Sequence, residues 1–168
     1  MTEQSDTKAG HSRTLLAELL LEEVLATLAL AIVILAVTWG VLTRYVTSTP
    51  ASWSGELASI AFAWAVFLGA AAAFRRSGHI AIDTFLYLVP PRAAFTLRLM
   101  SAAITLATLA VVTYLAIGFT LSTTDVPTTI LRWPQATIYA AAAVGFGAMT
   151  VRHAMSSFET LFRKAPEA

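Results

Sequence analysis

The sequence predicts an all-α membrane protein, a four-transmembrane-helix bundle with a short amphipathic helix at the membrane interface. Hydrophobic residues make up 57% of the 168 residues and charged residues 12%, whereas soluble chains average about 45–50% and about 25%. Four stretches contain no charged residue: 24–43, 57–74, 99–124 and 133–151. Each is close to the length of about 20 residues that crosses a bilayer as a helix.

The elements follow one another in a simple order. Residues 1–12 are polar and are expected to be disordered and cytoplasmic. The transmembrane domain is expected over 13–158, and a cytoplasmic tail over 159–168. The spans are predicted at about 21–43, 56–74, 97–121 and 134–154. No cleavage pattern follows the first apolar run, so we expect it to be retained as a span.

Two amphipathic segments accompany the spans. Residues 12–23 are expected to form a helix that runs into the first span. In the second segment, about 79–89, apolar residues recur with helical spacing until Pro90 and Pro91 stop the helix. These apolar residues are Ile82, Phe85, Leu86 and Val89. This second helix either lies in the cytoplasmic interface or braces a partner, and the two interpretations are compatible.

The distribution of positive charge predicts the orientation. Lysine and arginine number nine in the N-terminal segment, the middle loop and the C-terminal end together. The other two loops hold only Arg44 and Arg132. Because cytoplasmic flanks carry the excess of lysine and arginine, both termini are predicted to be cytoplasmic. This segregation requires an even number of spans and supports four.

Composition and motifs argue against several classes of function. A net charge of +1 provides no basic field for nucleic acid. No histidine lies in mid-span to ligate haem, and no catalytic or metal-binding spacing appears, so neither an enzyme nor a cofactor is predicted. Glu56, Arg98 and Arg152 lie near span ends, where they can reach an interface. A self-sufficient coupled transporter would be expected to bury carboxylates in mid-membrane.

The spans are rich in small residues instead. On the second span a stripe recurs every four residues, made of Ala61, Ala65, Gly69 and Ala73. Such stripes let helices approach closely in lipid, so Gly69 is expected at a tight crossing and Phe67, on another face, toward lipid. The fourth span carries a second small-residue surface, which includes Gly145 and Gly147. We expect packing within the bundle to use at least one of these surfaces and a partner subunit to be able to use the second, and the sequence does not assign which is which.

Residues 53–83 carry a family resemblance. Trp53-Ser54-Gly55-Glu56-Leu57 is followed by a run from Trp64 to Ala71 and by a third run from Arg75 to Asp83. Together they resemble the small permease (DctQ-type) subunit of tripartite ATP-independent periplasmic (TRAP) transporters. Arg44, Trp133 and Gly145 also lie at positions similar to that family's. The chain departs from the family at Gly55, Ser59 and Ala143.

The resemblance implies a function that the residues alone do not. It implies a non-catalytic subunit that braces the large TRAP permease subunit, with a periplasmic solute-binding protein and membrane lipid as further partners. Transport of an organic acid or similar solute is then expected to be driven by an ion gradient, expected to be sodium, across a bacterial or archaeal inner or plasma membrane. The rival hypotheses are a self-sufficient homodimeric transporter and a haem-bearing membrane anchor of a redox enzyme.

The same resemblance supplies candidate residues for the partner interface. Three of them, Arg75, His79 and Asp83, are expected to serve assembly or the geometry of the bundle and not ion coupling, because they lie at the predicted cytoplasmic boundary. The full set comprises Arg44, Trp53, Glu56, Trp64, Phe67, Gly69, Arg75, His79, Asp83, Trp133 and Gly145.

Overall fold

The computed structural model describes residues 3–47, 49–76 and 91–163. They form four helices: α1 (Glu3–Val46), α2 (Trp53–Arg76), α4 (Pro91–Ser122) and α5 (Ala136–Arg163). Within these ranges the only strand-like pairing is an isolated bridge between Pro127 and Pro134. The predicted all-helical class is confirmed. The interfacial helix predicted at about 79–89 lies outside the described residues.

Three of the helices are long and apolar enough to cross a membrane. The candidate spans are Leu21–Val46, Trp53–Phe74 and Thr96–Ser122, and they overlap the first three predicted spans. The fourth predicted span folds as a helix, α5, but is not among these candidates. Its apolar part consists largely of alanine and glycine, which contribute less hydropathy than leucine or isoleucine. Its role as a span therefore stays a prediction.

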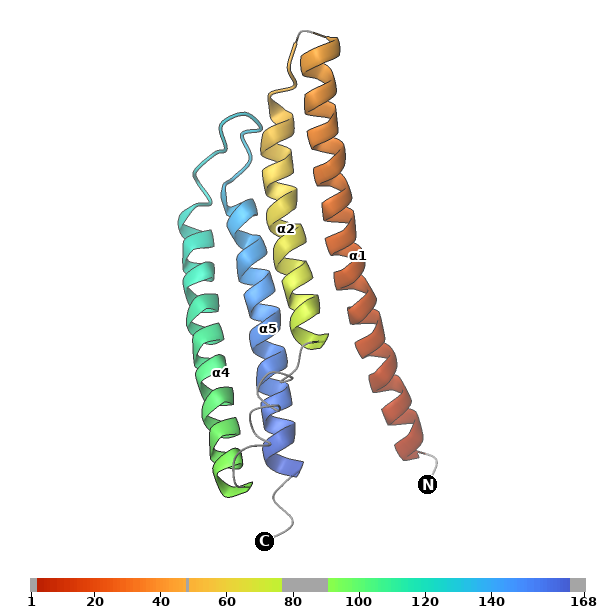
Figure 1. The fold of residues 1–168 in the computed structure, drawn as a ribbon, viewed down its shortest axis with the longest axis vertical. Helices are drawn as coiled ribbons and strands as arrows, with labels where there is room; N and C mark the ends of the chain where they lie inside the picture. The colour runs from red at the N-terminus through yellow and green to blue at the C-terminus, as the bar shows by residue number, and fades with distance from the viewer. Residues whose placement is uncertain (1–2, 48, 77–90, 164–168) are drawn as a thin grey trace.

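The helices stand side by side in the order α1, α2, α5, α4 (Figure 1). Helix α1 packs on α2, α2 packs on α5, and α5 packs on α4. The arrangement is an open row, whereas the sequence predicted a four-helix bundle. A membrane provides no hydrophobic force that would close such a row around a core, so apolar helix faces are free to contact lipid or another subunit.

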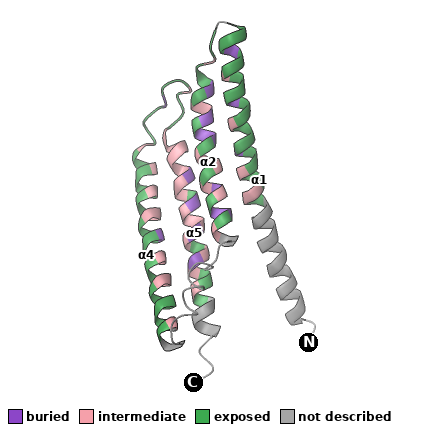
Figure 2. Ribbon diagram, in the orientation of Figure 1, coloured by how far each residue is buried: buried purple, intermediate pink, exposed green. Residues whose placement is uncertain are grey.

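The two inner helices hold most of the buried residues (Figure 2). In the apolar windows of α1 and α4 only 11% and 6% of residues are buried, against 33% in α2. The buried residues are mostly small, among them Ala58, Ala61, Ala71 and Ala141. Helix contacts therefore depend on close backbone approach, and the outer helices present broad apolar surfaces.

Helix α1 meets α2 along one narrow line of residues. Ala29, Ala36 and Thr43 are its buried members, each seven residues after the last, which is the spacing that keeps a helix facing one partner. On the same side, Gly40 lies against Ser54 of α2, whose Cβ would be 3.3 Å from a Cβ at Gly40. A line of small residues thus brings the two helices together while the rest of α1 stays exposed.

The N-terminal part of α1 differs from the expectation of disorder over 1–12. The helix begins at Glu3 and continues without interruption into the candidate span. No proline interrupts residues 3–46, so the predicted amphipathic helix 12–23 extends toward the N-terminus as part of one long element.

Candidate functional site

Helices α2 and α5 come into close backbone contact where they cross. A Cβ at Gly145 of α5 would lie 2.9 Å from both the Cβ and the carbonyl oxygen of Phe67 in α2. The ring of Phe67 meets that of Phe146 edge to face, with centroids 5.5 Å apart, an arrangement that aromatic pairs favour. Only glycine fits at position 145 without a shift of the backbone.

A tryptophan side chain ties the same two helices together nearer the loops. The Trp64 Nε1–H group donates a hydrogen bond to the carbonyl oxygen of Thr137, in the first turn of α5, at 3.0 Å. Since Trp64 is half-buried in an apolar surface, this bond satisfies a donor that lipid could not satisfy. Trp64, Phe67 and Gly145 thus form one α2–α5 contact.

Glu56 connects the start of α2 to the loop between α4 and α5. Its Oε2 atom accepts hydrogen bonds from the backbone N–H groups of Ile130, at 3.0 Å, and Leu131, at 2.8 Å. The carboxylate lies in the first turn of α2, where the helix dipole favours negative charge. Two elements more than 70 residues apart are thereby joined by charge-assisted hydrogen bonds.

The loop that Glu56 holds is itself closed by hydrogen bonds. Thr128 donates its N–H to the carbonyl oxygen of Trp133 at 2.7 Å, and the Trp133 N–H returns to Thr128 Oγ1 at 3.0 Å. Between them Arg132 has a φ of 58°, a left-handed conformation that is uncommon for a residue other than glycine. The resulting turn exposes the side chains of Ile130 and Trp133.

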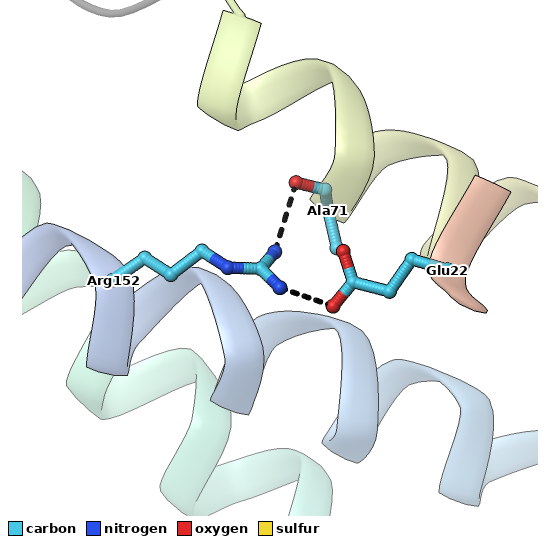
Figure 3. A network of polar contacts seen from close by, with 3 residues as sticks. All are labelled: Glu22, Ala71 and Arg152. Carbon is cyan, nitrogen blue, oxygen red and sulfur yellow. Dashed lines mark hydrogen bonds and ion pairs between the residues drawn. The ribbon is translucent and has the colours of Figure 1, made fainter. Parts of the chain in front are cut away.

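A second polar contact joins α5 to α1 and α2 at the ends of the helices that lie away from the 128–133 turn (Figure 3). Arg152 Nη2 of α5 donates to Glu22 Oε1 of α1, and Arg152 Nη1 lies 3.4 Å from the Ala71 carbonyl oxygen of α2. From the sequence, Arg152 is expected near a span end, where it can reach an interface, and its pairing with Glu22 is not predicted. The available signal was an acid and a base at the same predicted side of the membrane, each beside an apolar run.

Helices α4 and α5 are joined by further polar contacts. The hydroxyl groups of Thr113 and Thr150 lie 2.9 Å apart, within hydrogen-bonding distance. His153 is buried, with Nε2 3.2 Å from the Ala102 carbonyl oxygen, and its ring lies edge to face with that of Phe74. These contacts are structural, and within the described residues no group of three or more His, Cys, Asp or Glu side chains gathers to hold a metal.

The candidate residues drawn from the sequence separate into two groups. The structure brings Trp64, Phe67 and Gly145 together between α2 and α5. Glu56 accepts hydrogen bonds from the 128–133 turn, which Trp133 helps to close. The others do not join these contacts. Arg44 and Trp53 are exposed at the ends of α1 and α2, Arg75 lies in the last turn of α2, and His79 and Asp83 lie outside the described residues.

Two expectations about α2 are wrong within this chain. Among the described residues nothing lies within 4 Å of a Cβ placed at Gly69, so Gly69 is not at a tight crossing between the four described helices. Phe67, expected to face lipid, instead packs on Gly145 and Phe146. The expectation for Gly69 fails because the Ala61–Ala73 series does not stay on one face of α2. It turns gradually around the helix, so that Ala61 is buried and Ala73 is exposed.

Comparison with known proteins identifies relatives of the chain. The sequence model of the family described as "Tripartite ATP-independent periplasmic transporters, DctQ component" matches residues 33–163. A curated relative from Vibrio cholerae serotype O1, the sialic acid TRAP transporter small permease protein SiaQ, is 33% identical over 79 residues. That match covers 47% of this chain and 46% of the relative. Helix α2, with the residues of the α2–α5 contact, lies within the family match.

Proposed function

We propose a function that starts from the family: the chain belongs to the DctQ components of the tripartite ATP-independent periplasmic transporters, and it is a multi-pass membrane subunit of that class. The family is one of transporter components and not of enzymes. In our proposal the chain braces the large permease subunit, while a periplasmic solute-binding protein delivers the solute. Both termini face the cytoplasm, and the membrane is the bacterial inner membrane.

The observation that supports this function best is the exposure of the two outer helices. Large apolar residues on every side of α1 except its contact with α2 are exposed, including Leu28, Ile34 and Leu35. A four-helix row with two apolar outer helices offers surface to lipid and to a larger membrane subunit. An interface between membrane helices needs shape complementarity and close approach more than it needs charge.

The proposed transport is the uptake of an organic acid or similar solute, driven by an ion gradient that we take to be sodium. The relative's name mentions sialic acid, which is a carboxylate-bearing sugar and fits this solute class. The coupling site belongs to the large subunit in our proposal. Glu22 is committed to Arg152 and Glu56 to a loop, so neither carboxylate is offered for ion coupling.

Co-purification and uptake test the proposal together. The tagged chain, expressed with a large TRAP permease subunit, is expected to retain that subunit in detergent. Proteoliposomes that contain both subunits, supplied with the binding protein and a sodium gradient, are expected to take up solute. Uptake by this chain alone would favour the self-sufficient transporter, and a Soret band that follows the purified chain would favour the haem-bearing anchor.

A further inference from the structure

Glu22 and Arg152 link the first helix of the chain to the last (Figure 3). Glu22 lies at the start of the candidate span of α1, and Arg152 lies in the C-terminal half of α5. The guanidinium reaches both the carboxylate of Glu22 and the carbonyl oxygen of Ala71 in α2. A single side chain therefore contacts α1 and α2 from α5.

This ion pair is largely withdrawn from solvent. The side chains of Arg152 and Glu22 are 24% and 16% exposed, and Ala71 is fully buried beside Leu109 and Met149. The second carboxylate oxygen of Glu22 is buried and finds no hydrogen-bond partner among the described residues. Removing one member of such a pair leaves an uncompensated buried charge, whereas removing both is often tolerated.

The position of Glu22 on α1 explains how the pair can hold this helix to α5. Glu22 lies seven residues before Ala29 and continues the line of Ala29, Ala36 and Thr43 that faces α2. These small residues allow close approach, but within the described ranges they provide no polar contact that reaches beyond α2. Near the end of α2, the Glu22 carboxylate extends this line to α5.

We infer that Glu22 and Arg152 are positioning residues that set the angle of α1 against the other helices. The pair holds the Glu22 end of α1 to α5, so it fixes the shape of the apolar face that the row offers. The consequence for transport rests on the proposed function, because that face is where a large subunit would be braced. The angle itself is a property of this chain and can be measured without a partner.

Distance measurements between spin labels test the inference. The native chain contains no cysteine, so Leu25→Cys and Met155→Cys, both at exposed positions, label α1 and α5 near the pair without background. We expect a narrow distance distribution in the native background. Arg152→Met is expected to broaden it and shift it to longer distances, and Arg152→Lys, which keeps the charge, is expected to restore most of the narrow component.

The double variant separates a charge pair from simple loss of packing. Glu22→Gln combined with Arg152→Met leaves no buried charge unpaired, so it is expected to show a narrower distribution than Arg152→Met alone. Should Arg152→Met fail to fold, recovery of folding in the double variant would support the inference. Asp125→Asn, which removes an exposed carboxylate in the loop between α4 and α5, serves as the control and should leave the distribution unchanged.

An unchanged distribution in Arg152→Met would overturn the inference, as would a double variant at least as disturbed as that single variant. The same variants are then measured for retention of the large subunit and for uptake. If the native chain retains no large subunit, the proposed function fails, while the spin-label distances still decide whether the pair positions α1.

Discussion

Phe67 and Gly145 lie directly opposite each other where α2 crosses α5. A Cβ at Gly145 would come within 2.9 Å of both the Cβ and the carbonyl oxygen of Phe67. Neither atom belongs to the flexible end of a side chain, so a rotamer change cannot relieve the contact. The backbones of the two helices must move apart if position 145 carries any side chain.

Gly145→Ala is therefore expected to destabilise the chain. Overpacking in a tightly packed interior typically costs about 1–3 kcal/mol, and Gly145→Leu should cost more than Gly145→Ala. The measurement is thermal unfolding of the purified chain in detergent, followed by circular dichroism. Because the clash includes backbone atoms of Phe67, adding Phe67→Ala should not rescue either variant. Rescue by Phe67→Ala would show that the aromatic ring, and not the backbone, limits the approach.

Gly69 offers the matched contrast on the same helix. No atom of the part of the chain that the structure describes lies within 4 Å of a Cβ at this position, so Gly69→Leu should leave the unfolding temperature of the isolated chain nearly unchanged. Retention of the large subunit by tagged Gly69→Leu is the second measurement. Loss of retention in a folded variant would assign this side of α2 to the partner, whereas a lowered unfolding temperature would contradict the open space found here.

The sequence predicted the helices well because their signal is local. The charge-free runs and Pro50 are sufficient to separate α1 from α2. The polar and charged segments between the other apolar runs separate α2, α4 and α5. Gly145 and Phe67 were both among the candidates, but the contact between them was not predicted. A repeat of small residues every four positions drifts around a helix of 3.6 residues per turn, so it does not identify one buried face over 13 residues.

Contacts between distant segments were the part that the sequence did not reveal. The bonds of Glu56 to the N–H groups of Ile130 and Leu131 depend on backbone atoms, which leave no trace in residue type. The Glu22–Arg152 pair involves residues 130 positions apart. Each charge alone is well explained as the polar end of a span, and only the packing of α1 and α5 on either side of α2 brings them together.

Orientation in the membrane is tested by labelling single cysteines. The excess of lysine and arginine predicts cytoplasmic termini, so Thr49→Cys and Thr124→Cys in the two other loops should react with an impermeant maleimide added outside intact cells. Ser77→Cys, beyond the end of α2, should react only after the membrane is permeabilised. The cysteine-free native chain provides the blank. The reverse labelling pattern would contradict the predicted orientation.

The last prediction concerns the carboxylate of Glu56. One oxygen atom accepts both loop N–H groups, and both belong to the turn in which Arg132 has the left-handed conformation. Without an acceptor these groups turn to water, and the loop loses its tie to α2. A glutamine retains a carbonyl oxygen that can accept hydrogen bonds, although more weakly than a charged oxygen.

We therefore expect Glu56→Ala to speed amide hydrogen exchange at Ile130 and Leu131, with Glu56→Gln intermediate between Glu56→Ala and the native chain. Exchange followed by mass spectrometry on the 123–135 peptide measures the effect, and peptides from α4 should stay as protected as before. Asp125→Asn is the matched control, because this exposed carboxylate lies in the same loop but makes no hydrogen bond to the turn among the described residues. Equal exchange in Glu56→Ala and the native chain would mean that the closing bonds between Thr128 and Trp133 hold the turn by themselves.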